Sequence, residues 1–188
     1  MINFKNKKPK LLVIGDLMID QYLWGSCERI SPEAPVQVIN VTSDNEVLGG
    51  AGNVINNLKK LGAKVDVISV VGDCKISIDL KNLLGKIGID TQYLITQKNR
   101  TVSKKSRIIA SQQQVVRYDR ESSDDIDIQS QKTLISIFKK IIKNYEVILL
   151  SDYGKGVLTN KVTSTLIKLA NIDGIKVLVD PKGANYSK

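Results

Sequence analysis

The sequence predicts an α/β protein whose helices cover both faces of a mostly parallel, doubly wound sheet. Short apolar runs typical of buried strands alternate with helical patterns between residues 11 and 179. Two stretches, about 22–47 and 101–121, interrupt this alternation with strand-like patterns, and we expect them to pair as a small β lid. Polar residues follow three of the buried strands, which predicts a binding site at the carboxyl edge of the main sheet.

Each element is predicted from its own pattern. Apolar runs indicate strands at residues 11–14, 64–71, 147–150 and 177–179. Apolar residues at helical spacing indicate helices at about 53–61, 76–87, 135–142 and 162–169, the first two ended by Gly62 and Gly88. Inside the lid segments we expect a strand at 36–41 after a turn-rich link at 30–35. A hairpin with strands 102–110 and 113–119 should turn at Ser111 and Gln112.

Composition excludes several classes of protein. The chain has 188 residues, no histidine and two cysteines, Cys27 and Cys74, without metal-type spacing, so transition-metal and histidine-dependent chemistry are disfavoured. The net charge of +9 is spread along the chain with few aromatic residues, which argues against nucleic-acid binding. Apolar runs are too short to cross a membrane, and the polar lead-in at 1–9 lacks a secretory pattern, so a cytoplasmic protein is expected.

A glycine-rich stretch at 48–53 opens the first predicted helix. Gly49 and Gly50 allow a ligand to approach the backbone, and the first helical turn offers free N–H groups. Asn53 either caps this helix or binds a ligand hydroxyl. The alternative is a tight turn with nothing bound. The stretch lies between the two lid segments and opposite Asp20, which favours a ligand site over an empty turn.

Polar side chains gather at three predicted strand ends. Asp16 and Asp20 follow the first strand, Asp152 and Lys155 follow the third, and Lys182 follows the last. A single aspartate at a strand end is usually a helix cap. Three such ends together with the glycine turn favour a site for a polyol or a phosphate, in which the two lysines would neutralise phosphate charge or merely solvate helix ends.

Five ordered motifs carry a family resemblance across nearly the whole chain. They are GDLMID (15–20), RISPEAPV (29–36), GGAGNV (49–54), LSDYGKG (150–156) and DPKG (180–183). Together they resemble the ribokinase-like (carbohydrate kinase) family, and within it the kinases of heptose 7-phosphate that form one half of a bifunctional enzyme. The resemblance implies ATP-dependent phosphorylation of D-glycero-β-D-manno-heptose 7-phosphate at O1. The product would feed ADP-heptose and lipopolysaccharide core synthesis.

The resemblance also implies roles for particular residues. Asp20 matches the carboxylate that binds sugar hydroxyls, and Gly49, Gly50 and Asn53 match the sugar-binding turn. In the predicted hairpin, three polar side chains are candidates for substrate contacts: Arg107, Gln113 and Arg117. An arginine there would hold the 7-phosphate through charge-assisted hydrogen bonds, whereas the alternative is an ordinary solvated strand.

The catalytic parts expected of this family are missing from the sequence. Phosphoryl transfer needs Mg²⁺ and electrostatic stabilisation, which the family supplies through a later Gly-Ala-Gly-Asp segment, whose Asp is the base, and an Asn-x-x-Glu element. Neither occurs here. We therefore predict no catalytic residue and no metal ligand within 1–188, and we expect the catalytic base beyond Lys188. The chain is expected to be the N-terminal part of a ribokinase-like kinase domain, inactive alone, with ATP and Mg²⁺ bound mainly elsewhere.

Three alternatives stay open at this stage. A kinase for a different sugar would use the same glycine turn and Asp20. A non-catalytic sugar-binding or interaction module would need only the lid sheet, which could pair with a second copy as a homodimer. A nucleic-acid binder would show strongly salt-dependent affinity.

Overall fold

A computed structural model describes residues 8–183 of the chain. The strands are β1 (Lys10–Gly15), β2 (Leu17–Ile30), β3 (Gln37–Gly50), β4 (Lys64–Val71), β5 (Leu94–Thr96), β6 (Ser103–Ala110), β7 (Gln113–Arg120), β8 (Val147–Ser151) and β9 (Lys176–Asp180). The helices are α1 (Ala51–Lys60), α2 (Lys75–Lys86), α3 (Ile128–Ile141), the 3₁₀ turn η1 (Ile142–Asn144) and α4 (Asn160–Ile172).

Two sequence predictions fall outside the described residues. Of the polar lead-in predicted at 1–9, only residues 8 and 9 are described. Lys188, beyond which the catalytic base is expected, lies outside the described residues as well. The position of the base therefore stays a prediction.

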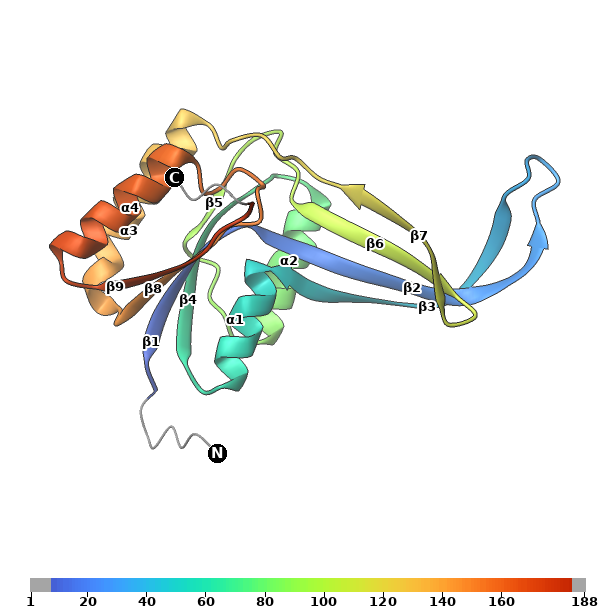
Figure 1. The fold of residues 1–188 in the computed structure, drawn as a ribbon, viewed down its shortest axis with the longest axis horizontal. Helices are drawn as coiled ribbons and strands as arrows, with labels where there is room; N and C mark the ends of the chain where they lie inside the picture. The colour runs from blue at the N-terminus through green and yellow to red at the C-terminus, as the bar shows by residue number, and fades with distance from the viewer. Residues whose placement is uncertain (1–7, 184–188) are drawn as a thin grey trace.

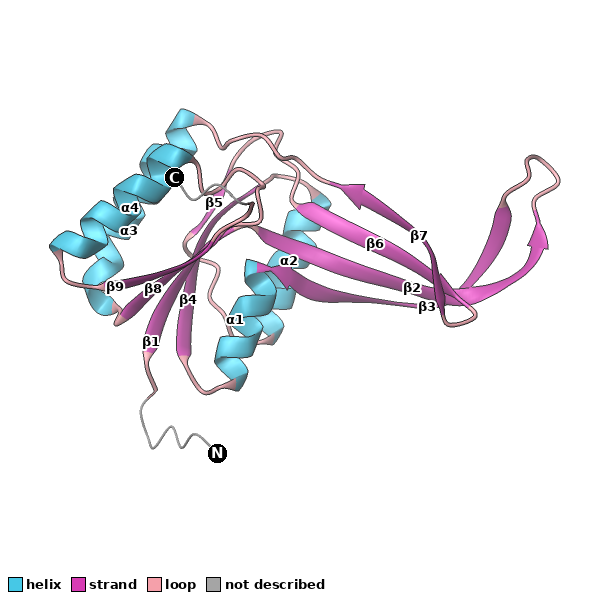
Figure 2. Ribbon diagram, in the orientation of Figure 1, coloured by secondary structure: helices cyan, strands magenta, loops and turns pink. Residues whose placement is uncertain are grey.

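The main sheet has five parallel strands in the order β5-β4-β1-β8-β9. Helices α1 and α2 cover one face, and α3 and α4 cover the other (Figures 1 and 2). Right-handed crossovers between parallel strands place helices in this way. The predicted doubly wound α/β architecture is confirmed.

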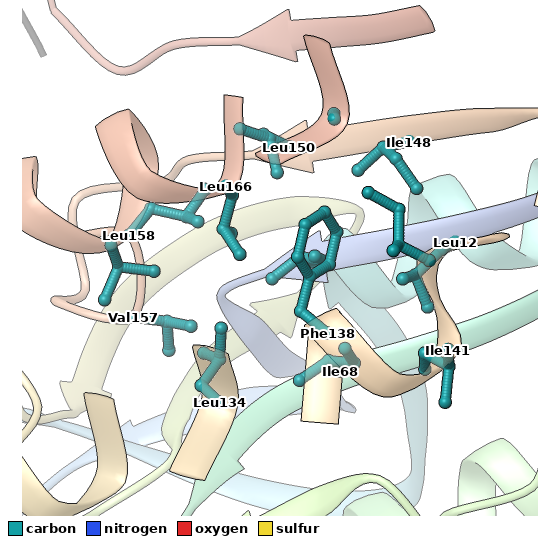
Figure 3. Packing of buried hydrophobic residues seen from close by; sticks show 14 of the residues in the cluster. Leu12, Ile68, Leu134, Phe138, Ile141, Ile148, Leu150, Val157, Leu158 and Leu166 are labelled. Atoms are coloured by element: carbon teal, nitrogen blue, oxygen red, sulfur yellow. The ribbon is translucent and has the colours of Figure 1, made fainter. Parts of the chain in front are cut away.

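Alternating side chains of the central strand feed two separate cores. Leu12 and Ile14 of β1 face α3 and α4, while Val13 faces α1 and α2. Phe138 of α3 is fully buried among the side chains of the first core, with Ile68 close by (Figure 3). A strand apolar on both faces is what a sheet covered twice requires.

Four strands form a second sheet, here called the lid sheet, in the order β3-β2-β6-β7. Strand β2 pairs antiparallel with β3 and parallel with β6, and β6 pairs antiparallel with β7. In Figure 1 this sheet extends sideways from the body of the molecule, beyond α1 and α2. Strands β2 and β3 have 14 residues each, and the start of β2 and the end of β3 lie together beside the carboxyl end of β1.

Several sequence predictions need correction at the base of the lid sheet. The first lid strand begins at Leu17, ahead of the predicted lid segment at about 22–47, so Asp20 lies inside β2. Helix α1 begins at Ala51 with Gly50 as its N-cap, and no side chain caps it, so Asn53 is an exposed first-turn residue. Leu61, the last residue of the helix predicted at 53–61, lies at the C-cap and is 68% exposed.

Two features of the main sheet also differ from the prediction. Strand β5 was not predicted, because its three residues are too few to show a pattern. Strand β9 was predicted to be a core strand, yet Leu178 and Val179 are exposed because β9 is the edge of the sheet among the described residues. No helix between residues 8 and 183 has the length and apolarity to span a membrane.

Candidate functional site

Asp16 is the only residue between β1 of the main sheet and β2 of the lid sheet. It is 1% exposed. Its carboxylate accepts hydrogen bonds from three backbone N–H groups, those of Tyr153 (2.8 Å), Lys155 (3.1 Å) and Val157 (3.1 Å). Burial raises the pKa of this carboxyl, and the three N–H donors oppose the rise. Asp16 therefore holds the loop after β8 against the joint between the two sheets.

The loop after β8 brings the second and third predicted strand ends together. Asp152 is buried, accepts a hydrogen bond from the backbone N–H of Gly154 at 2.9 Å, and donates its own N–H to the carbonyl oxygen of Asp180 at 2.9 Å. A Cβ atom on Gly154 would lie 3.3 Å from Cγ of Lys182, so the exposed Lys182 side chain passes over this loop. The three strand ends thus meet at one edge of the main sheet, as predicted from their parallel order.

The two glycines at the end of β3 are required by close contacts. A Cβ atom on Gly49 would lie 2.3 Å from Oδ2 of Asp20. Gly50 has φ of 54°, and a Cβ there would lie 2.6 Å from the carbonyl oxygen of Asp16. The same carbonyl accepts the N–H of Ala51 at 3.0 Å. The glycine stretch therefore lets the start of α1 pack directly against the Asp16 joint and Asp20.

Asp20 and Arg107 form an ion pair across β2 and β6. The distance from Oδ1 of Asp20 to a terminal guanidinium nitrogen of Arg107 is 2.7 Å, and each side chain is 21% exposed. The guanidinium lies over the Tyr22 ring at 5.3 Å from its centroid. The hydrogen bond that Arg107 donates to Asp20 raises the pKa of Arg107. One carboxylate oxygen thus faces the arginine while the other faces the glycine backbone.

A second group of charges lies beside this pair on the same face of the lid sheet. Lys105 is the register partner of Asp20 on β6, and its Nζ is 3.1 Å from Asp119 and 3.4 Å from Glu121. Nζ of Lys155 is 2.6 Å from the other oxygen of Glu121. The hydrogen bond from Lys155, together with the charge of Lys105, lowers the pKa of Glu121. Ion pairs therefore connect the lid sheet to the loop after β8.

The remaining hairpin candidates lie further out. Arg117 faces Arg107 across β6 and β7, is 49% exposed, and pairs with Asp119 at 3.0 Å. Gln113 is exposed beside the hairpin turn, opposite Ala110. Asn53 is exposed on α1. The structure thus brings Arg107 and Arg117 next to Asp20 and Asp119, and leaves Gln113 and Asn53 at the surface.

Sequence reasoning missed three charged residues of this region. Lys105 could have been found, because it lies two residues from the candidate Arg107 on one strand and so shares its face. Glu121 lies just after β7, where no strand pattern continues. No pattern marks Arg100, which is 6% exposed and donates hydrogen bonds to the carbonyl oxygens of Asp124 (3.1 Å) and Lys155. Burial lowers its pKa. Together with Asp16 it lines a cavity of about 10 Å³, room for roughly one water molecule.

The geometry of the site is that of a protein that binds a small polar ligand. Carboxylates, guanidinium groups and a glycine backbone gather where a β lid joins the ligand-binding edge of a doubly wound sheet, an arrangement suited to a small polyhydroxylated or anionic ligand. Within residues 8–183 no group of three or more histidine, cysteine or acidic side chains is placed to hold a metal ion.

The sequence profile described as pfkB family carbohydrate kinase matches residues 8–188, and the chain belongs to this family. The Bifunctional protein HldE of Aliarcobacter butzleri (strain RM4018) is 65% identical over 183 residues, and that of Campylobacter curvus (strain 525.92) is 51% identical over 182. Each match covers 97% of this chain and 38% of the relative, so the chain spans about two fifths of the length of these relatives.

Solved structures agree on the fold. A structure of Arabidopsis thaliana ribokinase complexed with ribose and ATP matches with a TM-score of 0.63 at 15% identity, over 95% of this chain and 55% of that one. A carbohydrate kinase from Agrobacterium tumefaciens matches with a TM-score of 0.66 at 19% identity, over 91% and 53%. The ribokinase-like fold predicted from the motifs is confirmed.

Proposed function

We propose that this chain forms the sugar-binding side of a kinase that phosphorylates D-glycero-β-D-manno-heptose 7-phosphate at O1, in the route to ADP-heptose and the lipopolysaccharide core. The observation that carries the proposal is the Asp20–Arg107 pair, held at 2.7 Å against the glycine backbone where the lid sheet meets the main sheet. A carboxylate beside a guanidinium offers an acceptor for sugar hydroxyls and a donor for phosphate oxygens. The similarity to the bifunctional HldE proteins supports the heptose assignment.

Each candidate side chain has a proposed task. Asp20 accepts hydrogen bonds from sugar hydroxyls above the floor formed by Gly49 and Gly50, and Asn53 contacts the rim of the sugar. Arg107 and Arg117 face the 7-phosphate, with Gln113 at the outer end of the hairpin. Asp152, Lys155 and Lys182 form the opposite wall. Asp16 is a positioning residue, because its carboxylate is buried and already bonded to the loop that carries Lys155.

ATP is the proposed phosphoryl donor, with Mg²⁺ as its counter-ion. Mg²⁺ would neutralise charge on the transferred group. The described residues contain no acidic cluster placed for a metal ion, so no step is assigned to them through Mg²⁺. The chain's own residues bind and orient the sugar phosphate, and the catalytic base is proposed to lie beyond Lys188. A homodimer formed through the lid sheet stays a prediction, which sedimentation analysis of the purified chain would test.

Calorimetric titration of the chain with three sugars tests the substrate. We expect heptose 7-phosphate to bind more tightly than fructose 6-phosphate, and both to bind more tightly than ribose. If ribose bound best, the heptose assignment would be wrong.

A pair of matched variants tests the site itself. Asp20→Asn should weaken binding of heptose 7-phosphate about tenfold or more, since a hydrogen bond from the sugar to a charged group is lost. Asp44→Asn is the control, because Asp44 is an exposed carboxylate of the same sheet that faces Gln21 instead. Equal effects of the two substitutions would remove Asp20 from the site.

An activity assay tests whether residues 1–188 suffice. We expect no turnover of heptose 7-phosphate and ATP by the chain alone, and turnover by a chimera that continues it past Lys188 with the remaining sequence of the Aliarcobacter butzleri relative. The chimera carrying Asp20→Asn is the control for background activity. Equal activity of the chain and the chimera would contradict the proposal that the catalytic parts lie outside this chain.

A further inference from the structure

Two lysines from different parts of the fold converge on one carboxylate. Lys105 belongs to the lid strand β6 and Lys155 to the loop after β8, and their Nζ atoms lie 3.4 Å and 2.6 Å from Glu121. Glu121 follows the last residue of β7 and has no regular secondary structure of its own. The carboxylate therefore ties the exit of the lid sheet to the body of the molecule.

The position of this contact links it to the proposed sugar site. Lys105 is the register partner of Asp20, so it lies beside the carboxylate proposed to bind the sugar. The backbone of Lys155 is fixed by Asp16, whereas its long side chain is free to change partners. Two ammonium groups around one oxyanion are the arrangement that binds a phosphate, which carries more charge than a carboxylate.

We infer that Glu121 is an intramolecular substitute for the substrate's phosphate, holding Lys105 and Lys155 in the free protein and leaving them when a phosphate binds. The identity of the sugar that carries the phosphate rests on the proposed function, but the exchange applies to any phosphate that reaches the two lysines. The residue thereby lowers the affinity for phosphates and leaves the affinity for neutral sugars unchanged, because only a phosphate competes with Glu121 for the two lysines.

The charges permit this exchange. Lys105 keeps Asp119 as a partner at 3.1 Å when Glu121 leaves. Lys155 has no other ion pair among residues 8–183, so it needs a new anion. The Lys155 and Glu121 side chains are 19% and 27% exposed, and ion pairs open to water are weak enough for a ligand to displace.

Titration calorimetry with Glu121→Gln tests the exchange directly. The probes are inorganic phosphate, heptose 7-phosphate and the same heptose without phosphate. We expect the substitution to tighten binding of both phosphates about two- to fivefold, the range that loss of one partly exposed ion pair allows. Binding of the neutral heptose should not change.

Glu46→Gln is the matched control. Glu46 lies on the lid strand β3 and, like Glu121, is a carboxylate paired with a lysine, here Lys104 at 2.5 Å. It lines a separate hollow of about 270 Å³ together with residues of α2. Its removal should leave the affinity for both phosphates unchanged. If it tightened binding as much as Glu121→Gln, a general charge effect would replace the exchange.

The outcomes separate this inference from the proposed function. If inorganic phosphate gains affinity in Glu121→Gln while heptose 7-phosphate does not bind, the substrate assignment fails and the exchange stands. If both phosphates bind equally well or more weakly in Glu121→Gln, or if neither protein binds either phosphate, the exchange is overturned.

A measurement on the unaltered protein covers the case in which the variant does not fold. Carbon-detected NMR titration gives the pKa of Glu121 without and with saturating inorganic phosphate. The pKa is held low by Lys155 and Lys105 in the free protein. It should rise toward the ordinary glutamate value when phosphate takes the lysines. A pKa that stays low in the phosphate-bound protein would overturn the inference.

Discussion

The main sheet and the lid sheet are stabilised in different ways. In the main sheet, β1 has five consecutive buried residues and both faces are covered by helices. In the lid sheet, all eight residues of β7 are exposed, and ion pairs such as Arg107–Asp20 and Lys105–Asp119 lie across its strands. Burial of apolar side chains therefore stabilises the main sheet, which leaves the lid sheet free to present charged side chains to a ligand.

The greatest loss in the free energy of unfolding should follow a substitution in the core of the main sheet. Phe138→Ala should lower the free energy of unfolding by about 3–5 kcal/mol, because the ring is fully buried and its removal leaves a cavity. Urea denaturation followed by circular dichroism measures the change. Val116→Ala, at a 45% exposed position of β7, is the counterpart and should cost less than about 0.5 kcal/mol. Similar losses in the two variants would contradict the contrast between the sheets.

The joint between the sheets should respond next most strongly. Asp16→Asn removes one acceptor from a buried carboxylate that serves three N–H groups, and it should cost about 1–3 kcal/mol. Hydrogen exchange at the loop amides of Tyr153 and Val157 should speed up. Asp90→Asn is the control, because Asp90 also accepts a backbone hydrogen bond but is exposed. Equal costs of the two substitutions would show that burial of Asp16 has no part in stability.

A smaller effect is expected four residues further along the chain. Asp20→Asn should change the free energy of unfolding by less than about 1 kcal/mol, because its ion pair with Arg107 is open to water. The same urea series measures it. A loss as large as that of Asp16→Asn would make Asp20 a structural residue and would weaken its assignment to the ligand.

The smallest effect concerns pH. Glu121 has a lowered pKa in the folded protein, so its ion pair stabilises the fold above the ordinary glutamate pKa, and this contribution is lost as pH falls through the folded value. Glu121→Gln should therefore lower stability by a few tenths of a kcal/mol, at most about 1 kcal/mol, at pH 7, and its difference from the unaltered chain should shrink as the pH falls below the ordinary glutamate pKa. A pH-independent difference in the urea midpoints would contradict the ion pair.

The two regions also differ in how far the sequence predicts them. Buried strands and amphipathic helices follow directly from apolar spacing, and Gly62 and Gly88 end their helices with positive φ, as predicted. The hairpin turn at Ser111 and Gln112 is confirmed by φ values of 49° and 64°. These features depend on neighbouring residues alone, so a single sequence contains them.

Strands β2 and β3 were harder to predict because nothing buries them evenly. Their outer halves are exposed or only half-buried, and register shifts at Trp24/Gly25 and Cys27/Arg29 break the alternation of side chains. The role of Asp16 could not be predicted either, because its three partners lie 137 to 141 residues away. Asp16 looked like a ligand contact because a strand-end carboxylate has the same appearance in sequence whether it binds a sugar or the chain itself.

Strand β2 leaves the main sheet at Asp16, and β3 returns beside it, so any rotation of the lid sheet would have its pivot there. Strand β2 has 14 residues, and at about 3.3 Å per residue its contour is roughly 45 Å long, which sets an upper limit on its reach because register shifts interrupt it. A rotation of about 10° at the joint would therefore move the far end by up to roughly 8 Å while moving Asp20 by only about 2 Å. Atoms near the pivot would keep their geometry during such a rotation, whereas the far end of the lid sheet would move through a wide arc. Side chains that need precise contacts with a ligand are therefore suited to the base of the lid sheet, and side chains that enclose the ligand are suited to its far end.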